Sequence, residues 1–134
     1  MKNIRHFGIP IKDINESLKF YVGLLGFVVL RQDTIQGEYV EKLLLKKTKI
    51  TYIKLGFGNS DTLLELLYFS KPNRASANYH FAISVDNICA LYKKLSSAHV
   101  FFVSPPFKAP DSNCKLCFCI DPSGNMIELV EDIK

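Results

Sequence analysis

A nine-residue pattern occurs twice in this chain and constrains its fold more than any other feature. Residues 6–14 read His-Phe-Gly-Ile-Pro-Ile-Lys-Asp-Ile, and residues 80–88 read His-Phe-Ala-Ile-Ser-Val-Asp-Asn-Ile. Both copies alternate apolar and polar residues, as a half-buried strand does, and both lead into apolar residues at helical spacing. A chain of 134 residues is long enough for one domain with its own core. We therefore predict one domain built from two copies of a strand–helix module.

The first module is predicted over about residues 1–69 with the order βαβββ. Its first strand alternates Phe7, Ile9 and Ile11, and Asp13 caps the following helix with Glu16 as the capping-box partner. Gly26 is a natural end for that helix. The remaining strands are expected at 27–31, 50–55 and 62–69, and residues 37–47 form a short helix or a wide loop.

The second module is predicted over about residues 79–134, after a polar linker at 70–78. It begins with a strand at 80–85 and a helix marked by Ile88, Leu91 and Leu95. A strand at 100–103 and a proline-bearing loop at 104–113 follow, before a hairpin of 116–120 and 126–131 around Asp121–Asn125. The predicted fold is α+β: two tandem βαβββ modules form a cupped mixed sheet of eight strands around a metal site.

Two glutamates stand where the pattern should be apolar. Glu65 lies within Leu-Leu-Glu-Leu-Leu and Glu128 within Met-Ile-Glu-Leu-Val, in strands that we expect to be buried on both faces. An unpaired carboxylate there would cost roughly several kcal/mol, so it must be neutralised, paired or bound to a metal. A glutamate among leucines also pairs with Arg or Lys in some proteins, and a lone strand histidine is often an ordinary core or surface residue.

Strand parity places these glutamates with the two histidines that begin the repeats. If Phe7 and Phe81 face the helices, His6 and His80 point to the other face. Glu65 is flanked by leucines, and Glu128 is flanked by Ile127 and Leu129. If these apolar residues join the core, both carboxylates point to the same face as the histidines. Imidazole and carboxylate ligands suit one divalent ion of nickel, cobalt, zinc, iron or manganese. The predicted ligands are His6, Glu65, His80 and Glu128.

Charge and apolar content exclude several classes of protein. The net charge of +4 comes from scattered lysines, which argues against nucleic-acid binding. No apolar run reaches the roughly 18 residues of a membrane span, and the N-terminus does not read as a secretory signal. We therefore expect a cytoplasmic protein with reduced cysteines. Cys114, Cys117 and Cys119 supply too few sulfurs for a closed zinc site, so we interpret them as plain thiols.

The repeats and the strand motifs together resemble the vicinal oxygen chelate superfamily, whose members include glyoxalase I, methylmalonyl-CoA epimerase, extradiol dioxygenases and bleomycin-resistance proteins. The resemblance covers about residues 4–131. It rests on the segments Arg5–Asp13, Ser17–Tyr21, Leu25–Phe27, Leu63–Leu66, His80–Asp86 and Asp121–Leu129.

The ligand set resembles that of bacterial glyoxalase I most closely. The resemblance implies a lyase or isomerase of the lactoylglutathione lyase type, in which a metal-bound glutamate, Glu65 or Glu128, moves a proton α to a carbonyl. An acyl-CoA epimerase is the nearest alternative, followed by a metal-free ligand-sequestering protein or a dioxygenase. The resemblance also implies a small-molecule substrate and a homodimer, with the site formed within one chain or across two.

Two positions depart from bacterial glyoxalase I. Pro10 stands where that enzyme usually has an arginine that helps to hold glutathione, and Phe69 stands where it usually has an asparagine. We therefore expect weak use of glutathione.

By family analogy Phe118 lines the cup or belongs to the core. His99 ends a helix, and the lysines at 42, 46, 47, 49 and 54 form a solvated face or attract an anionic substrate.

Overall fold

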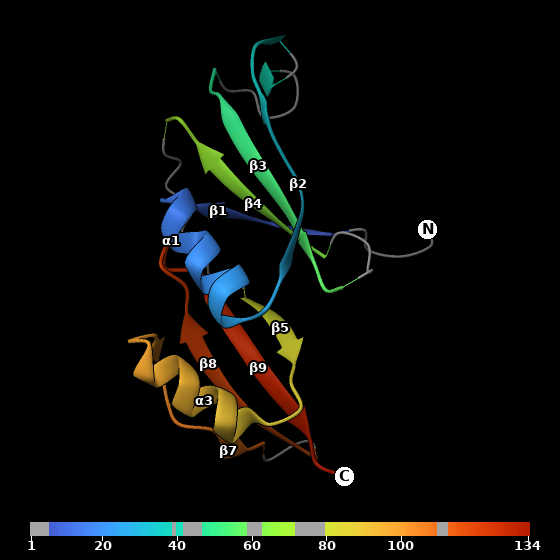
Figure 1. The fold of residues 1–134 in the computed structure, drawn as a ribbon, viewed down its shortest axis with the longest axis vertical. Helices are drawn as coiled ribbons and strands as arrows, with labels where there is room; N and C mark the ends of the chain where they lie inside the picture. The colour runs from blue at the N-terminus through green and yellow to red at the C-terminus, as the bar shows by residue number, and fades with distance from the viewer. Residues whose placement is uncertain (1–5, 39, 42–46, 59–62, 72–79, 110–112) are drawn as a thin grey trace. The chain divides into compact units, whose positions relative to one another are not determined.

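The computed structural model describes residues 6–38, 40–41, 47–58, 63–71, 80–109 and 113–134. The chain separates into two compact units, Met1–Ala75 and Ser76–Lys134, and each unit holds one mixed sheet with helix beside it (Figure 1). In the part of the chain that the structure describes, no helix is long and apolar enough to span a membrane. The two units are described separately below.

The first unit follows the predicted βαβββ order. Its elements are β1 (Phe7–Ile11), α1 (Ile14–Leu18), the π-helical η1 (Lys19–Leu24), β2 (Val28–Ile35), β3 (Ile50–Gly56) and β4 (Leu64–Phe69). The strands lie in the order β1-β4-β3-β2, and β1 runs parallel to β4 while the other neighbours are antiparallel. β2 extends four residues beyond its predicted end at 31. Of the predicted 37–47 segment, Glu38, Val40 and Glu41 are helical, and residues 39 and 42–46 lie outside the described residues.

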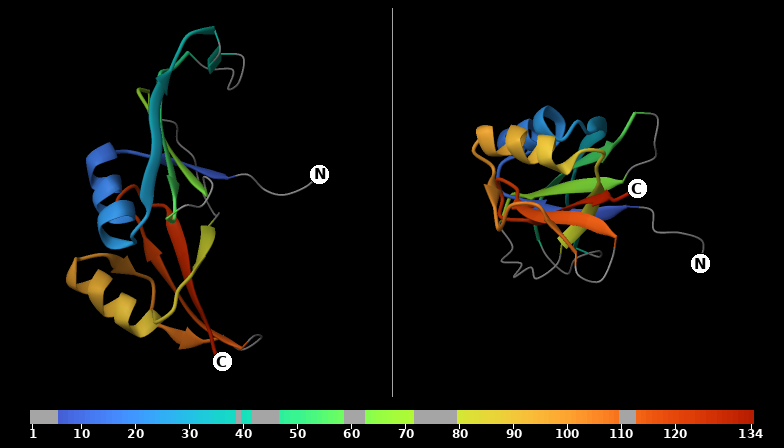
Figure 2. Two further views of the ribbon diagram at one scale, coloured as in Figure 1. Left: turned by 45° about the vertical axis from the view of Figure 1, so that its right-hand side comes forward. Right: turned by 90° about the horizontal axis from the view of Figure 1, so that it is seen from below.

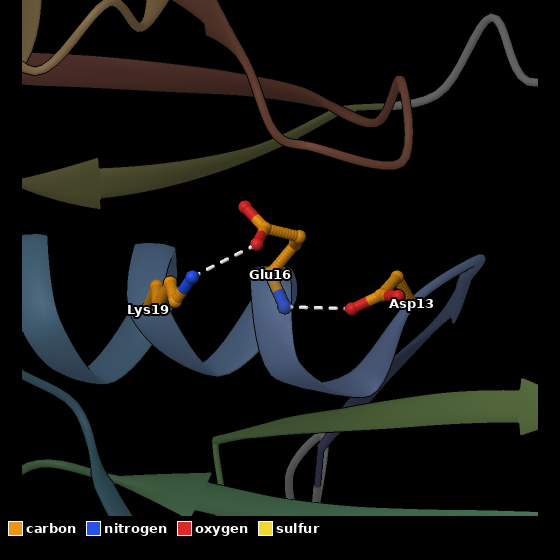
Figure 3. A network of polar contacts seen from close by, with 3 residues as sticks. All are labelled: Asp13, Glu16 and Lys19. Atoms are coloured by element: carbon orange, nitrogen blue, oxygen red, sulfur yellow. Dashed lines mark hydrogen bonds and ion pairs between the residues drawn. The ribbon is translucent and has the colours of Figure 1, made fainter.

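The helix of the first unit begins at Asp13, as predicted. The Glu16 amide donates to Asp13 Oδ1 at 2.8 Å (Figure 3), which satisfies one of the free amides of the first turn. The prediction that the Glu16 side chain accepts from the Asp13 amide, which is the second half of a capping box, is wrong. The Glu16 carboxylate instead accepts from Lys19 Nζ at 3.0 Å, because residues three apart are neighbours on a helix surface.

Gly26 ends this helix, also as predicted. Its φ of 80° is in the left-handed region that glycine enters without steric cost. The Phe27 amide then donates to the Tyr21 carbonyl at 2.9 Å. The Tyr21 ring is fully buried and meets Phe27, which stacks on Phe57 at 4.2 Å between ring centroids. These rings fix η1 against the start of β2 and the end of β3.

The second unit repeats this plan with one additional strand. Its elements are β5 (His80–Ser84), α3 (Ile88–Ser97), β6 (Phe101–Phe102), β7 (Phe107–Lys108), β8 (Cys114–Ile120) and β9 (Met126–Asp132). The order is β5-β9-β8-β6, with β5 parallel to β9 and with β7 paired to β8.

The α+β prediction is confirmed, although the described residues hold nine strands instead of the predicted eight. The described residues contain sheets of four and five strands. The extra strand, β7, lies in the predicted loop at 104–113, where Phe107 and Lys108 pair with Leu116 and Lys115 of β8. A two-residue strand is too short to show alternation in the sequence, so the sequence did not indicate it.

Helix α3 lies along one face of the second sheet (Figure 2). The Asn87 side chain accepts from the Ala90 amide at its start, and the Ile88 amide donates to Glu131 Oε2 of β9 at 2.7 Å. His99 follows the helix with a φ of 63°, the left-handed conformation that a helix end requires. The prediction that His99 is a helix-end residue is confirmed.

The turn before β9 is held by one buried carboxylate. Asp121 Oδ1 accepts from the amides of Ser123 and Asn125 at 2.8 and 2.7 Å, and Asp121 Oδ2 accepts from Asn125 Nδ2 at 2.8 Å. Asp121 and Asn125 are both buried. This network fixes where β9 begins and therefore which face each of its residues occupies.

We predict that Asp13→Ala lowers the free energy of unfolding by about 1 kcal/mol, because the Glu16 amide loses its acceptor. Denaturant unfolding monitored by circular dichroism measures this change. Asp13→Ser is the matched control, since a serine side chain also caps a helix, and it should recover most of the loss. Equal stability of the alanine variant and the wild type would contradict the role of Asp13.

Candidate functional site

The first unit brings His6 and Glu65 together. Gly8 of β1 lies opposite Glu65 of β4 in the parallel register. His6 precedes Gly8 by two residues, so it belongs to the same face. His6 Nε2 lies 3.9 Å from Glu65 Oε2. The parallel pairing of the first and last strands therefore makes neighbours of two residues that are far apart in sequence.

The second unit brings His80 and Glu128 together in the same way. Ala82 of β5 lies opposite Glu128 of β9, again in a parallel register and again two residues after the histidine. His80 Nε2 lies 3.2 Å from Glu128 Oε2. Each unit thus holds one histidine–glutamate pair, and the repeat observed in the sequence extends to the pairing of the strands.

The parity prediction is confirmed in both units. In the first sheet, the residues on either side of Glu65 are buried at 2% and 0% exposure; in the second, Ile127 and Leu129 are fully buried beside Glu128. The glutamates therefore point to the opposite face, which we call the open face of each sheet. The buried faces carry Ile9, Ile11, Ile53, Leu55, Leu64 and Leu66 in the first unit and Cys117, Cys119, Ile127 and Leu129 in the second.

The expectation that both glutamate strands are buried on two faces is wrong. The side chains of Glu65 and Glu128 are 17% and 19% exposed, and those of His6 and His80 are 39% and 44% exposed. Only one face of each strand is covered by core. Solvent therefore offsets part of the desolvation cost, and burial alone does not force the carboxylates to bind a cation.

The chemistry of each pair fits a divalent metal. Two ligands bound at about 2.1 Å with an angle of about 90–110° lie about 3.0–3.4 Å apart. The His80–Glu128 separation of 3.2 Å falls in this range, and the His6–Glu65 separation of 3.9 Å is about 0.5 Å longer than its upper limit. Within the described residues, no three His, Cys, Asp or Glu side chains gather in one place. Each unit by itself brings together two side chains of a kind that can bind a metal.

The neighbours of the two pairs differ. On the open face of the first sheet, Lys54 lies opposite Glu65, and its ammonium lies 5.5 Å from the centre of the Tyr52 ring. On the open face of the second sheet, Phe118 lies opposite Glu128 and meets His80 edge-on at 5.2 Å. Phe118 is half-buried and adjoins the pair. The sequence predicted that Lys54 belongs to a solvated face or attracts an anionic substrate, and the strand pairing places it opposite Glu65.

The cysteines of the second unit lie apart from the pair. Cys117 and Cys119 are fully buried on the face opposite Glu128, and Cys114 is buried as well. Burial raises the pKa of the Cys117 thiol to about 11 and that of the Cys119 thiol to about 12. Neutral, buried thiols behave as small apolar side chains, as the sequence interpretation expected.

Comparison with known proteins gives one consistent result. The family model described as Glyoxalase/Bleomycin resistance protein/Dioxygenase superfamily matches residues 3–129. A Vibrio cholerae protein named "Probable lactoylglutathione lyase" is 28% identical over 96% of this chain and 90% of its own length. A Haemophilus influenzae protein named "Lactoylglutathione lyase" is 31% identical over 96% of this chain and 92% of its own length.

A solved structure supports the fold independently. A glyoxalase family protein from Bacillus cereus has a TM-score of 0.82, with coverage of 100% of this chain and 96% of that chain. Its sequence identity is 15%, so this likeness concerns the fold alone.

We predict that a water-soluble disulfide reagent at pH 8 modifies Cys89 rapidly and modifies the other three cysteines only after denaturation. Cys89 is exposed and the others are buried. With a pKa of about 11, only about one Cys117 thiol in a thousand is ionised at that pH. Peptide mapping by mass spectrometry identifies the labelled residue, and Cys89→Ser should abolish the fast phase. Fast labelling of Cys117 or Cys119 in the folded protein would contradict this assignment.

Proposed function

Since the chain belongs to the Glyoxalase/Bleomycin resistance protein/Dioxygenase superfamily, we propose that it is a metal-dependent enzyme of the glyoxalase type that moves a proton α to a carbonyl group. One observation carries the proposal. A histidine and a glutamate face one another at the same strand register in both units, at 3.9 and 3.2 Å. The names of the relatives as lactoylglutathione lyases support the same reaction type.

The proposed ligands are His6, Glu65, His80 and Glu128, which bind one divalent ion of nickel, cobalt, zinc, iron or manganese. The two pairs combine within one chain or across a homodimer. Such an ion, when bound, supplies Lewis acidity to two neighbouring oxygens of the substrate and so lowers the pKa of the proton α to the carbonyl.

We place the enzyme in the cytoplasm, and we take residues 1–134 as one domain of two modules, about 1–69 and 79–134.

The proposed histidine and glutamate ligands have different roles. His6 and His80 would bind the ion through Nε2, and an imidazole whose free lone pair is bound to a metal cannot accept the substrate proton. The carboxylates of Glu65 and Glu128 are the groups able to accept a proton and return it. Both are half-buried and lie beside an imidazole, and either one would serve as the base.

Two residues on the open face of the first sheet favour a substrate other than the glutathione adduct. Pro10 and Phe69 have the same strand parity as Gly8 and Glu65, so both belong to this face. Neither side chain can donate a hydrogen bond. A carboxylate of glutathione would therefore lose the two polar contacts that the resemblance associates with these positions.

We predict that the reconstituted protein binds about one ion per set of four ligands, measured by elemental analysis and titration calorimetry. His6→Asn and His80→Asn should each weaken binding by more than about 100-fold, because loss of outer partners alone already costs about 10–100-fold. His99→Asn is the matched control and should leave binding unchanged. Two independent ions per set, or no tight binding of any of the five metals, would contradict a shared site.

We predict weak or absent turnover of the glutathione hemithioacetal of methylglyoxal by the metal-loaded protein. Proton exchange α to the carbonyl of another acyl compound should persist and can be followed by deuterium incorporation with NMR. Glu65→Gln or Glu128→Gln, whichever removes the base, should reduce the exchange rate by at least about 100-fold.

Glu16→Gln, on the exposed surface of α1, is the control for this substitution. Efficient turnover of the glutathione adduct by the wild type would contradict the expected loss of glutathione binding. Unchanged exchange in both site variants would contradict the glutamate mechanism.

A further inference from the structure

A row of charged side chains begins at Glu65 on the open face of the first sheet. Lys54 of β3 lies opposite Glu65 of β4, and Arg31 of β2 lies opposite Lys54. Neighbouring strands are about 4.8 Å apart. Two cationic side chains therefore start about 5 and about 10 Å from the strand that carries the proposed ligand.

A β-bulge puts Arg31 in this row. Val29 pairs with the buried Leu55, and the register then shifts so that Arg31 pairs with Lys54. Without the extra residue, Arg31 would pair with Ile53, which is fully buried. A slip of one residue exchanges the two faces of a strand, and bulges are a common means of redirecting a side chain.

Both cations lie near one aromatic ring. Tyr52 has the same strand parity as Lys54. The Arg31 guanidinium lies 6.0 Å and the Lys54 ammonium 5.5 Å from the Tyr52 ring centre, distances at which the face of a ring attracts a cation.

Two carboxylates lie near these cations. The Arg31 Nη2 atom lies 3.4 Å from Asp33 Oδ2 in an ion pair whose side chains are 61% and 54% exposed, and such pairs are weak. The second carboxylate is that of Glu65. Its binding to a metal would leave the Lys54 ammonium without that neighbouring counter-charge.

The second unit shows that the fold itself does not require this row. The position opposite Glu128 is Phe118, where the first unit has Lys54 opposite Glu65. Leu116 lies opposite Val130, where the first unit has Tyr52 opposite Leu67. The open face of the second sheet is apolar at the positions where the first unit is polar, so the cations belong to the first unit only.

We propose that Lys54 and Arg31 bind an anionic group of the substrate, a carboxylate or a phosphate, about 5–10 Å from the oxygens held beside Glu65. This inference rests on the proposed function. It names the substrate class as acyl compounds with a second, anionic end. Charge-assisted hydrogen bonds to lysine and arginine give such an end both affinity and orientation.

The test compares two chelators of equal length that present the same pair of adjacent oxygens. One is the monohydroxamate of glutaric acid, which ends in a carboxylate, and the other is pentanohydroxamic acid, which ends in a methyl group. Titration calorimetry with metal-loaded protein measures both affinities. We expect the wild type to prefer the carboxylate probe by about tenfold or more, and this preference should fall as salt rises.

Substitutions of single residues then test which side chains cause the preference for the carboxylate probe. Lys54→Met should abolish most of it, Arg31→Gln should reduce it, and Lys54→Arg should retain it. Lys19→Met on α1 removes an equal charge elsewhere and should leave the preference unchanged. Circular dichroism confirms that each variant is folded before titration.

The possible failures are distinguishable. Equal affinity of the wild type for the two probes, or an undiminished preference in Lys54→Met, overturns this inference while metal and hydroxamate binding keep the proposed function intact. Absence of metal binding, or of binding by both hydroxamates, overturns the proposed function and this inference with it.

Discussion

The parallel pairing of the first and last strands in each unit is the contact on which the candidate site depends. β1 lies beside β4 and β5 beside β9, and in each case the histidine precedes a residue that lies opposite the glutamate. Backbone hydrogen bonds fix this register, and the alternation of side chains then fixes the face. Because one face is core in both sheets, a slip by one residue would bury a carboxylate and expose a leucine. The apolar residues around Glu65 and Glu128 thus orient the polar ones.

The two units share this frame but use their open faces differently. Beside Glu65 the neighbouring strand offers Lys54, whereas beside Glu128 it offers Phe118. A duplicated module keeps the positions that its fold and the proposed ion require, and the remaining open-face positions are free to diverge. That divergence fits a substrate with chemically different ends. Function in a shared fold depends on the side chains of the site rather than on the architecture.

Much of the local structure was already readable from residue types. Asp13, Gly26 and His99 each have a side chain or conformational preference that acts within a few residues, so the helix ends were predicted correctly. The half of the capping box assigned to Glu16 failed for a similarly local reason, because Lys19 is a nearer partner on the exposed surface. The strand β7 was missed because its two residues are defined only by their pairing with β8.

The sequence by itself indicated the repeat, the α+β class, the shared face of each histidine and its glutamate, and the four candidate ligands, because alternation and repetition are properties of the chain order. Tertiary structure decided which residues are neighbours across strands, namely the 3.9 and 3.2 Å pairs and the placement of Lys54 beside Glu65. It also left the glutamates partly exposed, at 17% and 19%. It also decided that Arg31 joins that row, since a bulge changes the face of a residue without any mark in the local pattern. Contacts between distant segments depend on register, and register is set by the whole sheet rather than by any one strand.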